Sequence, residues 1–291
     1  MLDLSENFVV TAERLKSNWY LGFALDSLAE RLCYAKRTSH ADVVLERARS
    51  FWQTGSATAG LWEQRKLQVD VAAGRFADAL RRAGTCDVLL AEIERPLAPY
   101  LTSLHRLDAA LESDDVSGVT EYATEFRKRL AGVRYTLYQR LARLTEQRIR
   151  FAIADFEGVI EMGRAIATEF GHDERRYRRL LLGAAQLRAL AAIELGDGPE
   201  ARSAAATIEH SFEAALTAGY SDGAIAAYAV ASAYHCEGLL ADAERWFARA
   251  RTELNDICAR FGDSAASDAY RRRPIIRDIE GARPAFRLVR R

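Results

Sequence analysis

The oxygen-bearing side chains best placed for metal chemistry lie in two separate groups. These are Asp114 and Asp115 and, about 140 residues later, Asn255, Asp256 and Asp263. Two such groups facing each other across a helical cavity could hold magnesium against a diphosphate. The first group lacks a further carboxylate, however, and Ala259 stands where the second would need a hydroxyl. Because an aspartate pair is also ordinary in a turn, an all-helical enzyme acting on an anionic, diphosphate-type substrate is the alternative interpretation.

Other patterns of catalysis or metal binding are missing from the sequence. It contains no GxxxxGK[ST], HExxH or GxSxG pattern. Its four cysteines form no CxxC pair, and His235 and Cys236, as neighbours on a helix, would point in different directions. We therefore expect a protein that is not an enzyme, without metal or cofactor, whose thiols stay reduced.

The composition predicts the elements that must position any site. Hydrophobic residues make up 49% of the 291 residues and charged residues 28%, which is typical of a folded, soluble chain. Only five prolines occur, and residues 100–198 contain none. Alanine, leucine, arginine and glutamate are abundant, and all four favour helices. The sequence thus predicts an all-α protein.

The segment 224–255 has the pattern of two packed helices. Small and aromatic residues recur at helical spacing on either side of Gly238, at Ala227, Ala231 and Tyr234 and at Ala243, Phe247 and Ala250. Similar units recur along the chain, with the second helix of each unit aligned at Ala41, Ala79, Val119, Gly158, Ala201 and Ala243. The steps between these positions are 38 to 43 residues, and this regularity indicates a repeat protein.

This segment resembles the tetratricopeptide repeat (TPR), in the order small, aromatic, Gly, Ala, aromatic, Ala. The resemblance implies a right-handed α-solenoid of about six helix-turn-helix repeats in residues 1–263, closed by a capping helix in a basic tail, residues 264–291. The period exceeds the roughly 34 residues of a standard TPR, so HEAT-type repeats are the structural alternative. The tail also resembles the segment that follows TPR arrays in large bacterial signalling proteins.

The resemblance further implies a binding groove. In TPR arrays the first helix of each hairpin lines the concave face, which binds peptides. The residues at the corresponding positions would form a groove with amides throughout and a basic middle; they are Gln64, Gln68, Asp108, Arg140, Arg143, Gln147, Arg150, Gln186, Tyr228, Ser232 and His235. The arginines could equally form a solvated helix face, and His235 could be structural. The lysines and asparagines of the TPR carboxylate clamp are not reproduced.

Charge is unevenly distributed although the formal net charge is zero. Residues 271–291 contain eight arginines against Asp278 and Glu280, a net charge of +6. With the basic residues between Arg127 and Arg150, this tail favours an RNA-associated solenoid as a further alternative.

Neither a signal peptide nor a membrane helix is visible in the sequence, so we expect a cytoplasmic protein. The sequence as a whole predicts a protein- or peptide-binding scaffold of bacterial signalling or regulation, with an acidic protein or peptide as a candidate ligand.

Overall fold

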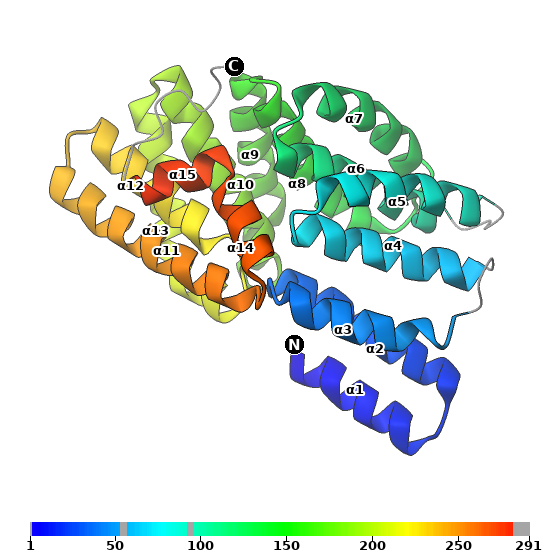
Figure 1. Ribbon diagram of the computed structural model, residues 1–291. Helices are drawn as coiled ribbons and strands as arrows, with labels where there is room; N and C mark the ends of the chain where they lie inside the picture. Colours follow the sequence, from blue (N-terminus) through cyan, green and yellow to red (C-terminus); the bar gives the residue numbers. More distant parts are fainter. Residues whose placement is uncertain (1, 53–56, 92–95, 282–291) are drawn as a thin grey trace. The chain divides into compact units, whose positions relative to one another are not determined.

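The computed structural model describes residues 2–52, 57–91 and 96–281, and the described residues contain no strand. These described residues form fifteen α-helices, which follow one another in the order drawn in Figure 1. The first seven are α1 (Leu2–Arg14), α2 (Asn18–Tyr34), α3 (Thr38–Arg49), α4 (Ala57–Ala72), α5 (Phe76–Leu89), α6 (Leu97–Ser113) and α7 (Val116–Leu130). The others are α8 (Thr136–Ala152), α9 (Phe156–Phe170), α10 (Glu174–Leu195), α11 (Gly198–Thr217), α12 (Gly223–Cys236), α13 (Leu240–Arg260), α14 (Ser264–Arg271) and α15 (Pro274–Glu280), with a 3-10 turn, η1, at Gly171–Asp173. The predicted all-α class is confirmed.

The helices form two compact units. One comprises Met1–Arg134 with Cys258–Tyr270, and the other Tyr135–Ile257 with Arg271–Arg291. The first unit contains the hairpins α2–α3, α4–α5 and α6–α7, and α1 packs against α2. The second contains the hairpins α8–α9 and α10–α11, followed by α12 and most of α13.

The first helices of neighbouring hairpins pack against each other. In the first unit α4 contacts both α2 and α6, and in the second α10 contacts both α8 and α12. Among the described residues no comparable packing joins the second helices α3 and α5, α5 and α7, or α9 and α11. Within each unit the first helices therefore form a continuous layer, and the second helices lie further apart.

One turn geometry recurs at the hairpins. Each first helix from α2 to α12 is followed by a residue with positive φ, at Lys36, Gly74, Asp114, Ala154, Gly196 and Gly238. The amide of the next residue then donates to a carbonyl five positions back, as from Arg75 to Asp70 (2.8 Å) and from Asp197 to Ala192 (2.8 Å). This is the hydrogen bond of the Schellman motif, which satisfies carbonyls at a helix end. The turns are 38 to 42 residues apart, so the period seen in the sequence is also present in the backbone.

Aspartates start the helices after three of these turns. Asp115, Asp155 and Asp197 each accept a hydrogen bond from the backbone amide three residues later, at 3.0–3.1 Å. The fourth hairpin, which lacks a turn glycine, still forms two helices because Ala154 adopts φ = 62°. Asp114 and Asp115, weighed above as metal ligands, thus end α6 and cap α7.

The small residues singled out in the segment 224–255 are buried. Ala227, Ala231 and Ala250 are fully buried, and Ala243 is 1% exposed. The second helix of this hairpin continues to Arg260, beyond the end expected near Asn255. The sequence has no proline there to stop it.

The C-terminal helices contact different partners within their own units. In the first unit the Ser39 hydroxyl donates to the Phe261 carbonyl (3.0 Å), and Lys36 lies 5.8 Å from the ring centroid of Tyr270. In the second unit α15 packs against α12 and buries Ile276 and Ile279 completely.

Candidate functional site

Two of the predicted groove residues join neighbouring helices. Gln64 on α4 donates from Nε2 to the Ala98 carbonyl (2.6 Å) and to the Thr102 hydroxyl (2.8 Å) at the start of α6. Gln147 on α8 is fully buried and donates from Nε2 to the Val159 and Ala184 carbonyls, at 3.0 and 3.1 Å. Both amide nitrogens are therefore engaged in tying helices together.

Four further groove residues are also buried. Gln68 accepts a hydrogen bond from Arg65, and Gln186 accepts one from the Tyr220 hydroxyl at 2.9 Å. Tyr228 and Ser232 are fully buried on α12. Burial, with the Asp278 carboxylate of α15, raises the pKa of Tyr228, so its phenol is neutral.

Asp108 and His235 are partly exposed. The Asp108 carboxylate lies 3.6 Å from His105 Nδ1 on the next turn of α6. His235, at the end of α12, lines a shallow surface depression together with Leu240, Ala243, Glu244, Phe247 and Arg251.

Arg143 and Arg150 are paired with acidic residues of their own hairpin. Arg143, whose side chain is 47% exposed, lies 3.0 Å from Glu169 on α9. Arg150 lies 2.7 Å from Asp155, the residue that caps α9. These contacts turn both side chains toward α9.

Leu141 stands two residues before Arg143, about 200° around the helix, so it faces away from α9, and its side chain is exposed.

Arg140 has a different environment. Its guanidinium lies 5.4 Å from the ring centroid of Tyr177 on α10 and 5.7 Å from that of Phe170, and it donates to the Tyr177 hydroxyl. Arg176, which is exposed, lies 5.4 Å from the same tyrosine ring. We call these four residues, Arg140, Phe170, Arg176 and Tyr177, the Arg–Tyr cluster. No described carboxylate lies within ion-pair distance of either arginine.

Sequence reasoning missed Tyr177, Arg176 and Phe170. The available signal was the run Glu174–Arg175–Arg176–Tyr177–Arg178–Arg179, which places two arginines in the first turn of α10. Helix dipoles favour acidic residues there, so stability of the helix does not account for these cations. Arg178 and Arg179 further along donate to the Ala214 and Ala218 carbonyls at the end of α11.

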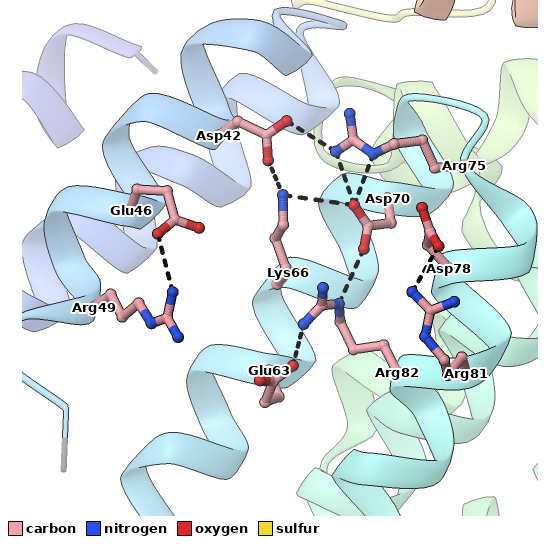
Figure 2. A network of polar contacts seen from close by, with 10 residues as sticks. All are labelled: Asp42, Glu46, Arg49, Glu63, Lys66, Asp70, Arg75, Asp78, Arg81 and Arg82. Carbon is pink, nitrogen blue, oxygen red and sulfur yellow. Dashed lines mark hydrogen bonds and ion pairs between the residues drawn. The ribbon is translucent and has the colours of Figure 1, made fainter. Parts of the chain in front are cut away.

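A second polar cluster, in the first unit, is internally neutralised (Figure 2). Asp70, whose side chain is 2% exposed, lies 2.8 Å from Arg75, 3.0 Å from Arg82 and 3.6 Å from Lys66. Asp42 pairs with Lys66 and Arg75, and Glu63 pairs with Arg82. The network joins α3, α4 and α5.

Equivalent ionic links occur in other hairpins. Lys66, Arg106 and Arg188 each stand thirteen residues before the aligned position of the second helix in their unit, at Ala79, Val119 and Ala201. Arg106 bonds to Asp87 of the preceding hairpin and Glu125 of its own, and Arg188 lies 2.7 Å from Glu200. The recurrence within hairpins indicates a structural role.

Cys33 and Cys86 are buried, and the acidic residues in the described part of the chain form no metal-binding group. Burial raises the pKa values of Cys33 and Cys86 to about 12, so both are neutral thiols. No group of three or more His, Cys, Asp or Glu side chains within the described ranges could hold a metal ion.

Comparisons with family models and with curated proteins found no match. No family model matches the chain, and no curated protein is similar to it. None of the helices within the described ranges is both long and apolar enough to cross a membrane.

Proposed function

We propose that this chain is a non-enzymatic module that binds a protein or peptide segment on the surface of α8 and α10. Its hairpins would form a right-handed, TPR-like solenoid with α15 as a capping helix, acting in the cytoplasm in bacterial signalling or regulation. The continuous packing of α8, α10 and α12 supports this proposal, because helical-repeat proteins bind ligands on such extended inner surfaces.

The observation that carries the proposal is the Arg–Tyr cluster beside exposed leucines. Leu137 and Leu141, four residues apart on α8, share one helix face and are 60% and 46% exposed. Arg140 next to them presents a cation without a carboxylate partner among the described residues. Apolar contact area beside hydrogen-bond donors is the combination that peptide-binding surfaces use.

A random-peptide display library panned against the full chain tests this function. We expect a consensus sequence among the selected peptides and measurable binding of synthetic copies. The double variant Leu137→Asp/Leu141→Asp should weaken binding at least tenfold, whereas Ile153→Asp should not, although Ile153 is similarly exposed at 45%. Absence of any consensus, or equal binding by both variants, would contradict the proposal.

RNA binding is the second candidate, and the exposed Arg175 and Arg176 favour it. It predicts affinity for single-stranded RNA that falls steeply as salt rises, because bound phosphates release counterions. Peptide binding through Leu137 and Leu141 predicts a weaker salt dependence. A titration at two salt concentrations distinguishes these functions.

A further inference from the structure

We infer that the Arg–Tyr cluster is an anion subsite for a phosphorylated serine or threonine side chain of a bound peptide. This inference rests on the proposed function and specifies the ligand class at that surface. It differs from the basic groove expected from the sequence, because Arg150 and Arg143 have carboxylate partners and two residues of α10 take part.

Two guanidinium groups lie close to the Tyr177 ring. Arg140 and Arg176 lie at equal distances, 5.4 Å, from the Tyr177 ring centroid. One guanidinium N–H of Arg140 is used on the Tyr177 oxygen, so this hydroxyl accepts there and keeps its own proton for donation. Tyr177 and two guanidinium groups together offer several N–H and O–H donors to a ligand.

The charge at this place is not balanced by the protein. From Arg140 to Arg179 the sequence has nine arginines against seven carboxylates, a net charge of +2, and Glu169, Asp173 and Glu174 are the carboxylates nearest in sequence to Phe170, Arg176 and Tyr177. Glu169 pairs with Arg143, Asp173 caps α10, and Glu174 lies 3.8 Å from Arg178. Each of these three carboxylates is already engaged, and neither Arg140 nor Arg176 pairs with a described carboxylate.

The contrast with other arginines makes this imbalance informative. Arg65 binds Asp26 at 3.0 Å through two of its nitrogens, and Arg129 binds Asp87 and Glu125. The two arginines of the Arg–Tyr cluster contact aromatic rings, whereas Arg65 and Arg129 contact carboxylates. Aromatic faces hold a guanidinium in place without neutralising it.

Phosphate matches this arrangement better than a carboxylate does. A phosphorylated side chain carries a charge of about −1.5 to −2 and three acceptor oxygens. Guanidinium groups bind such oxygens in pairs, and the Tyr177 hydroxyl can donate to the third. A carboxylate has two oxygens and a single charge, so it leaves part of the cluster unused.

A phosphoserine- and phosphothreonine-oriented peptide library, screened beside its unphosphorylated counterpart, tests the subsite. The best binder is then made in three forms, with phosphoserine, glutamate or serine at the same position. We expect affinity to fall in that order, with at least a tenfold difference between the first form and the last.

Variants locate the effect. Arg176→Glu should remove the preference for the phosphorylated form, and Tyr177→Phe, which keeps the ring, should reduce that preference about tenfold. Arg245→Glu is the matched control, because Arg245 is 68% exposed and pairs only locally with Asp242 at 3.1 Å. Melting curves of all variants verify that they are folded.

The outcomes separate this inference from the function beneath it. Equal binding of phosphorylated and unphosphorylated peptides, or an unchanged preference in Arg176→Glu, overturns the subsite while peptide binding stands. No binder from either library overturns both. Tight binding of single-stranded RNA that Arg176→Glu abolishes, without peptide binding, would assign the cluster to nucleic acid and overturn the inference.

Discussion

At the residue scale, arginine has two roles that its neighbours decide. Arg75 and Arg82 lie beside Asp70 and hold three helices together. Arg140 lies beside Tyr177 and Phe170 and has no carboxylate partner among the described residues, which is why we propose it as a ligand contact. Nothing in the local sequence separates these roles, since all of these arginines stand in or next to amphipathic helices.

Asp70 provides a test of the structural role. Asp70→Ala should lower the free energy of unfolding by about 3–5 kcal/mol, because Lys66, Arg75 and Arg82 would lose their buried carboxylate. Urea denaturation measures the change. Asp78→Ala is the control: Asp78 is 46% exposed and pairs with Arg81, so its loss should cost less than about 1 kcal/mol. Similar values for the two variants would show that the network contributes little.

At the element scale, the recurring hairpin turn explains the regular period. The residue after each first helix adopts a left-handed conformation, which glycine tolerates without strain and alanine does not. Gly238 at φ = 75° and Ala154 at φ = 62° occupy equivalent turns. Backbone geometry is therefore conserved between hairpins even where the residue differs.

Because the turns at Ala154 and Gly238 share one backbone conformation, exchanging alanine and glycine should change the stability in opposite directions at the two positions. Ala154→Gly should stabilise the protein by about 1 kcal/mol, because it relieves the left-handed strain. Gly238→Ala should destabilise it by a similar amount, since open space surrounds Gly238 and only strain is added. Thermal melts of both variants measure the pair, and shifts of the same sign would refute the equivalence.

Gly74 extends the same test to a packed turn. Alanine at position 74 would place its Cβ 2.5 Å from that of Ala269 on α14, in addition to the strain of φ = 75°. Gly74→Ala should therefore cost about 1–3 kcal/mol more than Gly238→Ala. Equal costs would indicate that α14 does not pack on this turn.

At the scale of the whole molecule, the C-terminal segment completes the packing. In the second unit, α15 packs against α12, and its Ile276 and Ile279 are completely buried. The ends of a helical-repeat stack need such cover, because each repeat otherwise leaves an apolar face open.

Loosening this cover should have a local effect. In the double variant Ile276→Ala/Ile279→Ala we expect faster amide hydrogen exchange in α12 and little change in α2 of the other unit, because repeats contact mainly their neighbours. Arg277→Ala, on the exposed side of α15, serves as the control. Uniform acceleration throughout the chain would show instead that the molecule unfolds as one cooperative body.

The sequence by itself determined the helical class, the period and most turns. These features depend on signals that act over a few residues, namely small and large residues at helical spacing, glycines such as Gly238 and caps such as Asp197. Their effects can therefore be predicted from short stretches of sequence. For the same reason the polar row at Gln64, Gln147 and Gln186 was identified as belonging to the first helices.

Only the tertiary structure decided what these polar residues contact. Gln147 finds carbonyls of α9 and α10, and Tyr228 lies under α15, so both are buried. Arg140 meets Tyr177, which is 37 residues away in the chain. Which residue a side chain contacts depends on how neighbouring hairpins pack together. Such contacts join residues that are tens of positions apart in the chain, whereas helical periodicity gives information only about residues within the same helix.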